Sequence, residues 1–148
     1  MIKELAHASN TVSAQIYGVF QRSYQIEADL IGTSEFPPLL RTSDDIANAE
    51  STFYGFFEQD SLAAVIEITC DSKQLSIESL TVDPSHFRKG IASKLIDFVL
   101  LHCNFSHAVV ETAAVNQPAI TLYEKHGFIE FKKWTPDHGI EKIALHRD

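Results

Sequence analysis

Three strand-like stretches follow one another between residues 52 and 82, and only short polar turns separate them. Residues 52–59, 62–70 and 75–82 are rich in β-branched, aromatic and aliphatic side chains, and the turns fall at residues 60–61 and 71–73. A parallel pair of strands needs a crossover of about a dozen residues, whereas turns of this length join antiparallel neighbours. The pattern therefore predicts an antiparallel meander of three strands.

The residues before the meander predict a short strand and two helices. Residues 2–6 suit a strand, and between residues 8 and 24 apolar side chains recur at helical spacing. Two prolines and a glycine require a loop over residues 32–38. Ser43, followed by two aspartates, suits the start of a short helix that ends near residue 49.

The residues after the meander alternate between helix and strand. Gly90 opens a helix, residues 108–114 form a strand, and a second helix over residues 116–127 has proline in its first turn and glycine just past its end. Residues 128–134 and 140–146 then form a hairpin. The predicted order is β-α-α-β-β-β-α-β-α-β-β: one α/β domain over residues 1–148, with a mixed, mostly antiparallel sheet and flanking helices.

Composition and charge exclude several classes of partner. The chain of 148 residues has the apolar and charged content of a globular protein, and its net charge of −8 disfavours nucleic acid. The longest apolar stretch, residues 61–70, is too short to span a bilayer, and the N-terminus has no apolar signal segment. We expect a cytoplasmic protein that binds neither nucleic acid nor membrane; a homodimer remains open.

The two cysteines, Cys70 and Cys103, lie in a strand-like and a helix-like stretch. No CxxC pair or clustered cysteine and histidine spacing accompanies them. We interpret both as buried thiols in a reducing compartment and expect neither a disulfide nor a metal site.

The segment over residues 80–95 is a candidate anion site. A strand ends at Pro84, a short loop follows, and a helix begins at Gly90. The start of a helix offers unpaired N–H groups and the positive end of the helix dipole, and glycine lets a phosphate approach the backbone. Arg88, Lys89 and Lys94 add positive charge, and no acidic residue lies within residues 84–96. A merely structural turn is the alternative interpretation.

The segment over residues 116–128 is a capped helix that carries Tyr123 on its inner face. On its own, this tyrosine suits packing in a core. A phenol has an ordinary pKa of about 10, so at physiological pH it is neutral and can donate a proton.

Together these two segments resemble the GNAT superfamily of acyl-CoA-dependent N-acyltransferases. The family's cofactor motif, Gln or Arg, two residues, Gly, one residue, then Gly or Ala, falls on residues 87–92, with Phe87 in place of the opening Gln or Arg. A later family pattern, N-x-x-A-x-x-L-Y-x-x-x-G-F, matches residues 116–128 at full spacing. The resemblance implies the GNAT fold and transfer of an acetyl group from acetyl-CoA, without a metal, to a primary amine of an unidentified small molecule or peptide.

The resemblance also implies roles for individual residues. The backbone of residues 88–93 would hold the pyrophosphate of CoA, the strand around residues 80–82 would pair with the pantetheine arm and splay away from the strand over residues 108–114, and Tyr123 would protonate the leaving thiolate. The cofactor-binding residues expected on this basis are Leu80, Val82, Arg88, Lys89, Gly90, Ile91, Ala92, Ser93 and Asn116.

Two glutamates are candidates for the general base. Glu78 shares strand parity with Leu80 and Val82 and would point to the same face of its strand. Glu67, inside an apolar stretch of the preceding strand, competes with it. The alternative for both is an ordinary carboxylate on the surface or at a strand edge.

Acceptor binding in this family usually involves the first two helices and their loop, here residues 24–41, where Tyr24, Glu27 and Asp29 are the candidates. Residues 27–83 hold twelve acidic residues against two basic ones, which suits a cationic amine but also plain solvation. A non-catalytic sensor or scaffold that binds acyl-CoA is the alternative function. Tyr123 argues against it, because a sensor needs no proton donor.

Overall fold

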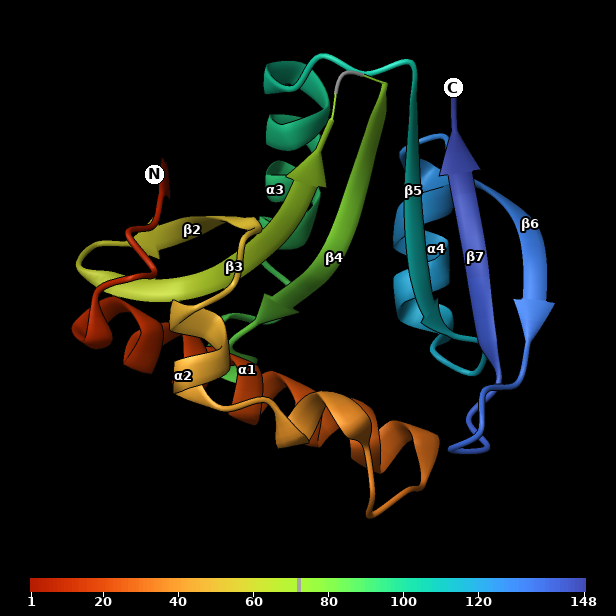
Figure 1. Cartoon of the computed structure of the whole chain (residues 1–148), viewed down its shortest axis with the longest axis horizontal. Helices are drawn as coiled ribbons and strands as arrows, with labels where there is room; N and C mark the ends of the chain where they lie inside the picture. The colour runs from red at the N-terminus through yellow and green to blue at the C-terminus, as the bar shows by residue number, and fades with distance from the viewer. Residues whose placement is uncertain (72) are drawn as a thin grey trace.

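A computed structural model describes residues 1–71 and 73–148, and it shows one seven-stranded sheet with helices on both of its faces (Figure 1). The sheet order is β1-β2-β3-β4-β5-β7-β6. The strands are β1 (Ile2–Glu4), β2 (Thr52–Glu58), β3 (Ser61–Cys70), β4 (Gln74–Val82), β5 (His107–Ala113), β6 (Ile129–Trp134) and β7 (Lys142–Arg147). The helices are α1 (Asn10–Ile31), α2 (Ser43–Ala47), α3 (Ile91–His102) and α4 (Gln117–Lys125), with 3-10 turns η1 (Pro37–Leu40) and η2 (Pro84–His86).

The predicted meander is confirmed. β2 pairs antiparallel with β3, and β3 with β4, and β1 adds an antiparallel edge strand beside β2. The predicted turn over residues 71–73 includes Ser72, which lies outside the described residues. The order of helices and strands also agrees with the sequence, so the α/β fold with a mixed, mostly antiparallel sheet is the one observed.

One local prediction in the segment before the meander was wrong, and a second was right over residues 32–36 and wrong for residues 37 and 38. The first helix does not end near residue 24, because α1 continues to Ile31 and ends only where Gly32 adopts a φ of 83°. Residues 25–31 contain neither glycine nor proline, and Ala28 is buried, so nothing interrupts the helix earlier. The predicted loop over residues 32–38 ends in the 3-10 turn η1, which the two prolines begin.

The sheet opens between β4 and β5. These two strands pair in parallel only over Gln74–Ile77 and His107–Val110, although both continue beyond that pairing. β7 stays paired with β5 along its length, so the second half of the sheet turns away from β4 as one unit (Figure 1). The splay that the family resemblance implied is therefore present.

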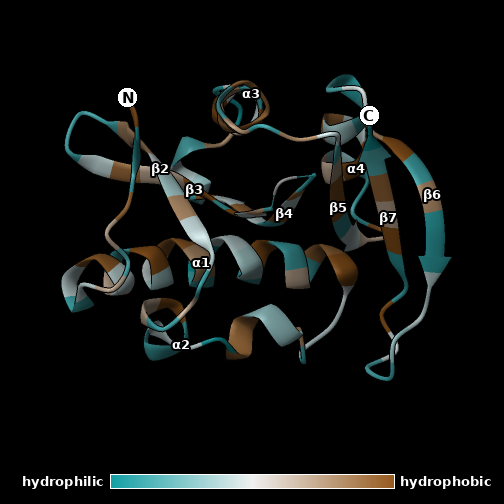
Figure 2. Cartoon of the chain, turned by 45° about the horizontal axis from the view of Figure 1, so that its top comes forward, coloured by the Kyte–Doolittle hydropathy of each residue, from teal (hydrophilic) through white to brown (hydrophobic). Residues whose placement is uncertain are grey.

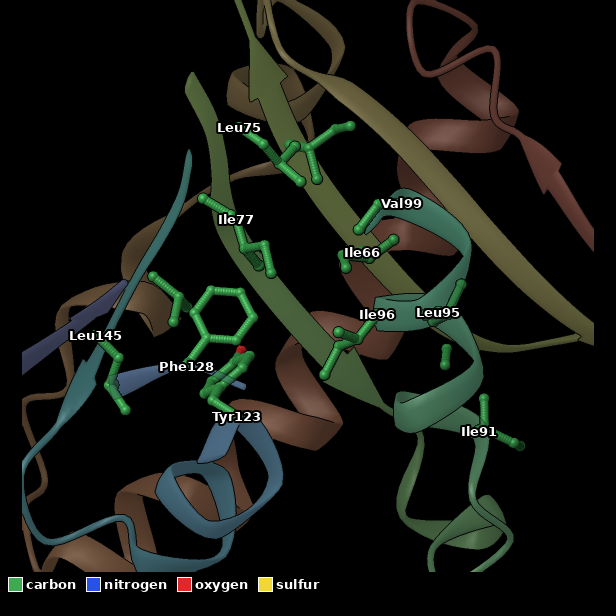
Figure 3. Packing of buried hydrophobic residues seen from close by; sticks show 14 of the residues in the cluster. Ile66, Leu75, Ile77, Ile91, Leu95, Ile96, Val99, Tyr123, Phe128 and Leu145 are labelled. Atoms are coloured by element: carbon green, nitrogen blue, oxygen red, sulfur yellow. The ribbon is translucent and has the colours of Figure 1, made fainter. Parts of the chain in front are cut away.

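The helices form one apolar layer on each face of the sheet. α3 and α4 pack over one face around Leu95, Ile96 and Phe128, while α1 and α2 cover the other around Phe20 and Ile46. α3 and α1 lie on opposite sides of the sheet in Figure 2, and Figure 3 shows the larger cluster with Tyr123 and Phe128 at its α4 end. α1 also contacts β4, the strand that leaves β5 after Ile77.

The prediction that both cysteines are buried was wrong. Cys70 is exposed and Cys103 is half-buried, and both are free thiols. Cys70 is the last residue of β3 and Cys103 caps the end of α3, so both lie where the helical layer ends. Burial, together with the neighbouring Cys70 thiol, raises the pKa of the Cys103 thiol.

Candidate functional site

Two cavities meet where β4 leaves β5. The first, here called the splay cavity, has a volume of about 430 Å³ and lies between β4, β5, α1 and the segment before β7. The second, the turn cavity, has a volume of about 490 Å³ and lies beneath the turn that leads into α3. Both cavities are lined by Glu27, Leu80, Asn116, Ala119 and Tyr123. These five residues therefore form the junction between the cavities.

The predicted cofactor-binding residues gather around the turn cavity. The following line it: Leu80, Val82, Arg88, Lys89, Gly90, Ile91, Ala92, Ser93 and Asn116. Sequence separates Asn116 from the others by more than twenty positions, and the return of β5 beside β4 brings it to them.

The turn into α3 exposes backbone N–H groups. Arg88 and Gly90 both have positive φ, 65° and 72°, so the chain reverses direction just before α3 begins. No side chain caps this helix, whereas Thr42 caps α2 and Asn116 caps α4. A Cβ on Gly90 would meet nothing within 4 Å, so space lies open in front of these N–H groups. The arrangement fits a bound phosphate.

Phe87, which departs from the family motif, lies at the rim of the turn cavity with 43% of its surface exposed. Its backbone N–H donates to the carbonyl oxygen of Pro84 at 3.3 Å, closing the 3-10 turn η2. The phenyl ring therefore stands beside the turn, and the N–H groups of α3 do not depend on it.

Tyr123 lies at the junction on the inner face of α4, with 5% of its surface exposed. Its ring meets that of Phe128 edge to face, with centroids 5.7 Å apart (Figure 3). Burial, together with the nearby Tyr24 and Glu27, raises the pKa of Tyr123 far above its ordinary value. The phenol is therefore neutral, and able to donate a proton, across the physiological range of pH.

Glu27 points from α1 into the junction, and the extension of α1 past Tyr24 is what brings it there. Burial raises the pKa of its carboxyl, while a hydrogen bond from the side chain of Asn116 and the charge of Lys142 oppose that rise. Asn116 also accepts from the backbone N–H of Ala119 at 3.3 Å, so the amide that caps α4 lies at the same junction as Glu27.

Asp29 lies two residues further along α1, but its carboxylate is exposed and accepts from Gln25 at 3.1 Å. It is absent from the described residues that line the two cavities. Of the three predicted acceptor residues, the structure therefore brings Tyr24 and Glu27 to the site and leaves Asp29 outside it.

The parity argument for Glu78 was wrong, because a β-bulge interrupts β4 at this residue. Glu67 pairs with Ser79 and Ile68 pairs with Ile77, which leaves Glu78 as the extra residue. The face of the strand changes across a bulge, so Glu78 does not share a face with Leu80. Glu78 is exposed, accepts from the hydroxyl of Thr69 at 2.8 Å, and lines the splay cavity.

Glu67, the competing base, is fully engaged. Arg41 donates to its two oxygens at 2.6 and 2.9 Å, and the hydroxyls of Ser51 and Ser79 donate to them as well. Burial alone would raise the pKa of Glu67, but the hydrogen bonds from Arg41 and Ser51 and the charge of Arg41 hold it below its ordinary value. A carboxylate with this set of partners is a structural anchor, since none of its oxygens faces either cavity.

The anchor orients the acceptor side of the splay cavity. Ser79 donates to Glu67, and Ser79, Arg41 and Tyr24 all line the splay cavity on this side. Arg41 follows η1 directly, so the same ion pair holds the 3-10 turn over the sheet. Sequence analysis missed Arg41 and Ser79, although Arg41 stands out as one of two basic residues in a long acidic stretch.

Sequence analysis also missed a charged pair at the opposite wall of the splay cavity. Lys142 on β7 donates to Glu111 on β5 at 3.1 Å, and both line the cavity together with His138. Nothing in the local sequence marks these residues, because cross-strand pairing alone joins them.

The described part of the chain, residues 1–71 and 73–148, holds no group of three or more His, Cys, Asp or Glu side chains that could bind a metal ion. Within these residues, no helix combines the length and apolar character needed to cross a membrane.

The sequence is similar to those of known acetyltransferases. The sequence model of the acetyltransferase (GNAT) domain matches residues 35–146. The chain is 34% identical over 129 residues to the UPF0157 protein YqkA of Bacillus subtilis, covering 86% of this chain and 38% of that protein. It is 37% identical over 90 residues to a streptothricin acetyltransferase of Escherichia coli, covering 58% of this chain and 52% of that protein. The chain thus spans about half or less of the length of these relatives.

Solved structures share the fold. The ribosomal-protein-S18-alanine N-acetyltransferase of Escherichia coli superposes with a TM-score of 0.78 at 20% identity, covering 99% of this chain and 92% of that one. Structures of similar fold include complexes with acetyl-CoA and with coenzyme A.

The ion pair of Arg41 and Glu67 makes a prediction about stability and pH. Arg41→Met leaves a buried carboxylate without its cation, which should lower the free energy of unfolding at pH 7 by about 3–5 kcal/mol. In the wild type the depressed pKa of Glu67 stabilises the fold above its unfolded value of about 4.3, and this contribution is lost as the pH falls through the lower folded value. In the variant the hydroxyls of Ser51 and Ser79 still donate to Glu67, but the cation that offset its burial is gone, so the pKa of Glu67 rises and stability should recover between pH 7 and about pH 5.

Urea unfolding at the two pH values measures this difference. Arg22→Met is the matched control, because it breaks an ion pair with Asp83 in which Arg22 is 56% exposed. We expect a loss below about 1 kcal/mol there and no acid recovery. Equal losses in the two variants would contradict the structural role of the buried pair.

Proposed function

We propose that this chain, which belongs to the acetyltransferase (GNAT) family, transfers an acetyl group from acetyl-CoA to a primary amine. The observation that carries the proposal is the junction of two cavities at the splay of β4 and β5. One cavity has a turn whose N–H groups carry no side-chain cap, and the other has Glu27, Glu78 and Glu111 in its lining beside Arg41 and Lys142. A neutral phenol stands between the two cavities. Such an arrangement suits a phosphate-bearing donor on one side and a cationic acceptor on the other.

The turn cavity fits CoA. The uncapped N–H groups at the start of α3 would hold the pyrophosphate, with Arg88 adding charge, while Lys89 is paired with Glu58 at 2.9 Å. Beyond Ile77 the edge of β4 that faces β5 is unpaired, so its backbone can bond the pantetheine amides as a neighbouring strand would. This path runs from the turn at Gly90 along Val82 and Leu80 to the junction.

At the junction the amine nitrogen would attack the thioester carbonyl carbon. The C–N bond forms, the C–S bond breaks, and CoA leaves as a thiolate that takes its proton from the phenol of Tyr123. The attacking nitrogen loses one proton as it becomes the amide, and this proton restores the phenol by way of solvent. An alkylammonium has a pKa of about 10.4, so it must lose a proton before it attacks. Three glutamates line the splay cavity, Glu27, Glu78 and Glu111. Glu111 is paired with Lys142, so Glu78 and Glu27 are the candidates to take that proton.

The acceptor would bind in the splay cavity as a cation. Glu27 is the partly buried carboxylate at the junction, and Tyr24 and Glu78 complete a polar wall on its side. A volume of about 430 Å³ admits a small amine or one end of a peptide. The names of the relatives include both an acceptor that is a small molecule, streptothricin, and one that is a protein, so they leave the acceptor's size open.

A non-catalytic acyl-CoA sensor is the competing function, and it shares the turn cavity. What favours the enzyme is the second cavity, which a sensor does not need, together with the buried phenol at the junction.

A turnover assay tests the proposal directly. The protein is incubated with radiolabelled acetyl-CoA and a panel of polyamines, aminoglycosides, amino acids and peptides with free N-termini. We expect labelled product from at least one amine. Gly90→Glu should abolish both CoA binding and turnover, since it places a carboxylate in the open space at the turn.

Gly32→Glu is the matched control, because Gly32 also has positive φ and open space but lies outside both cavities. If Gly90→Glu folds and binds CoA with unchanged affinity in calorimetry, the turn is not the donor site. Binding without turnover on any amine would favour the sensor.

Tyr123→Phe tests the proton donor. The ring and its packing on Phe128 remain, and only the hydroxyl is lost. We expect kcat to fall by about 10²–10⁴ while the affinity for CoA is nearly unchanged. Tyr17→Phe, a partly exposed phenol on α1, should leave kcat as it is. A fall of less than about threefold in Tyr123→Phe would place the acid elsewhere.

Glu27→Gln tests the acceptor wall. Removing the charge should raise the KM for the amine about tenfold or more, because a hydrogen bond to a charged group contributes about 1.5–3 kcal/mol. The KM for acetyl-CoA should not change. Asp29→Asn is the matched control on the same helix, and we expect wild-type values from it. An unchanged amine KM in Glu27→Gln would remove Glu27 from the acceptor site.

A further inference from the structure

The imidazole of His126 bridges two polar side chains on α3. Its Nε2 lies 2.9 Å from the hydroxyl oxygen of Ser93, and its Nδ1 lies 3.0 Å from Oδ1 of Asp97. The side chain of His126 is only 9% exposed. Ser93 and Asp97 are four residues apart on α3 and therefore lie on one face of that helix, where the ring of His126, at the end of α4, reaches both.

This chain of three groups connects two cavities. Ser93 lines the turn cavity, within the first turn of α3 where the proposed pyrophosphate site lies. Asp97 and His126 line a third cavity of about 640 Å³, here called the open cavity, between α3, the end of α4 and β7. Ser93 is not among its lining residues. The hydroxyl of Ser93 is thus the point at which His126 contacts the proposed donor site.

The direction of the hydrogen bonds depends on whether His126 carries one proton or two. An ionised carboxylate only accepts, so Asp97 takes the Nδ1–H of the ring. In the neutral ring Nε2 then has no proton and accepts from the Ser93 hydroxyl, whose proton points away from the turn cavity. In the imidazolium Nε2–H donates to Ser93, and the hydroxyl proton is free to be donated to a phosphate oxygen.

We propose that His126 is a positioning residue for the donor, taking up a proton as the phosphates of CoA bind and so turning the Ser93 hydroxyl toward them. This inference rests on the proposed function, since it assumes that the turn cavity holds those phosphates. The O–H···N bond from Ser93 to Nε2 is replaced by an N–H···O bond from Nε2 to Ser93, and one O–H···O bond from Ser93 to the phosphate forms. The proton comes from solvent through the open cavity around Asp97.

Several charged groups lie near His126, and Asp97 is the one that contacts its ring. From α3 the ring faces Asp97, while Arg88 and Lys89 line the turn cavity together with Ser93 and the ammonium of Lys89 is paired with Glu58. From β7, Arg147 donates to the backbone oxygen of His126 and not to the ring. The remaining charged or titratable groups that line the open cavity are Lys125, His146 and Asp148. Nδ1 of His146 lies 3.6 Å from Oδ1 of Asp148, so this second imidazole has an acidic partner of its own.

Calorimetric titration with dephospho-CoA tests the proposal. This probe keeps the pyrophosphate but lacks the phosphate monoester, whose own pKa of about 6 would otherwise titrate in the same range. Titrations near pH 7 in two buffers of different ionisation enthalpy give the number of protons taken up on binding. We expect a net uptake of a fraction of a proton. The Kd should rise about threefold to tenfold between pH 6 and pH 8, since one linked proton changes affinity at most tenfold per pH unit.

Two variants separate the proposed relay from other sources of pH dependence. His126→Gln removes the imidazole, and Ser93→Ala removes the hydroxyl but leaves its backbone N–H in place. Both should bind dephospho-CoA with a Kd that changes less than about twofold over the same range, without proton uptake. His102→Gln, at the exposed end of α3, is the matched control and should keep the wild-type pH dependence. Thermal melting of each variant establishes that it is folded.

The outcomes are distinct. If the wild type binds without proton uptake, or if Ser93→Ala retains the full pH dependence, the relay through His126 is overturned while the donor site stands. If a folded wild type does not bind dephospho-CoA or CoA at all, the proposed donor site itself fails, and the relay with it. Should His126→Gln fail to fold, the behaviour of Ser93→Ala decides alone.

Discussion

The end of hydrogen bonding between β4 and β5 is the constraint on which the rest of the site depends. The two strands separate after Ile77 and Val110, and β7 holds β5 from its other side, so the gap cannot close by moving β5 alone. An open edge inside a sheet leaves backbone groups without partners, which is costly unless something else meets them. The side chains of α1 and α4 line this opening, and it is where the two cavities meet.

The bulge in β4 is connected by hydrogen bonds to the buried ion pair of Arg41 and Glu67. Glu78 is the extra residue of the bulge, and immediately beyond it Ser79 turns to donate to the buried Glu67. Glu67 in turn holds Arg41, and with it the turn η1 over the sheet. A local irregularity of one strand is thereby tied to a segment that lies forty positions earlier in the sequence, and the wall of the splay cavity acquires a fixed shape.

The two ends of the proposed reaction path differ in how their polar groups are satisfied. At the acceptor end, side-chain and backbone groups bond one another, as Ser79 does with Glu67 and Asn116 does with the backbone of α4. At the donor end, the first N–H groups of α3 have no capping side chain, and the left-handed residues Arg88 and Gly90 hold the chain away from them. Groups that the protein leaves unpaired at a helix start are those that an anion can satisfy.

The order of elements, the antiparallel meander, the turn at Gly90 and the capped helix that carries Tyr123 could all be predicted from the sequence. Each of them depends on residues that are close together in the chain, such as a short turn, a glycine or a helix cap. The sequence did not determine where α1 ends, which face Glu78 takes, whether Glu67 is free, or that Asp29 lies outside the site while Glu27 lies within it. Those were decided by tertiary structure. A bulge, a splay and a buried ion pair arise from contacts between segments far apart along the chain, such as Arg41 with Glu67 and His126 with Ser93, and no local pattern encodes the distance between them.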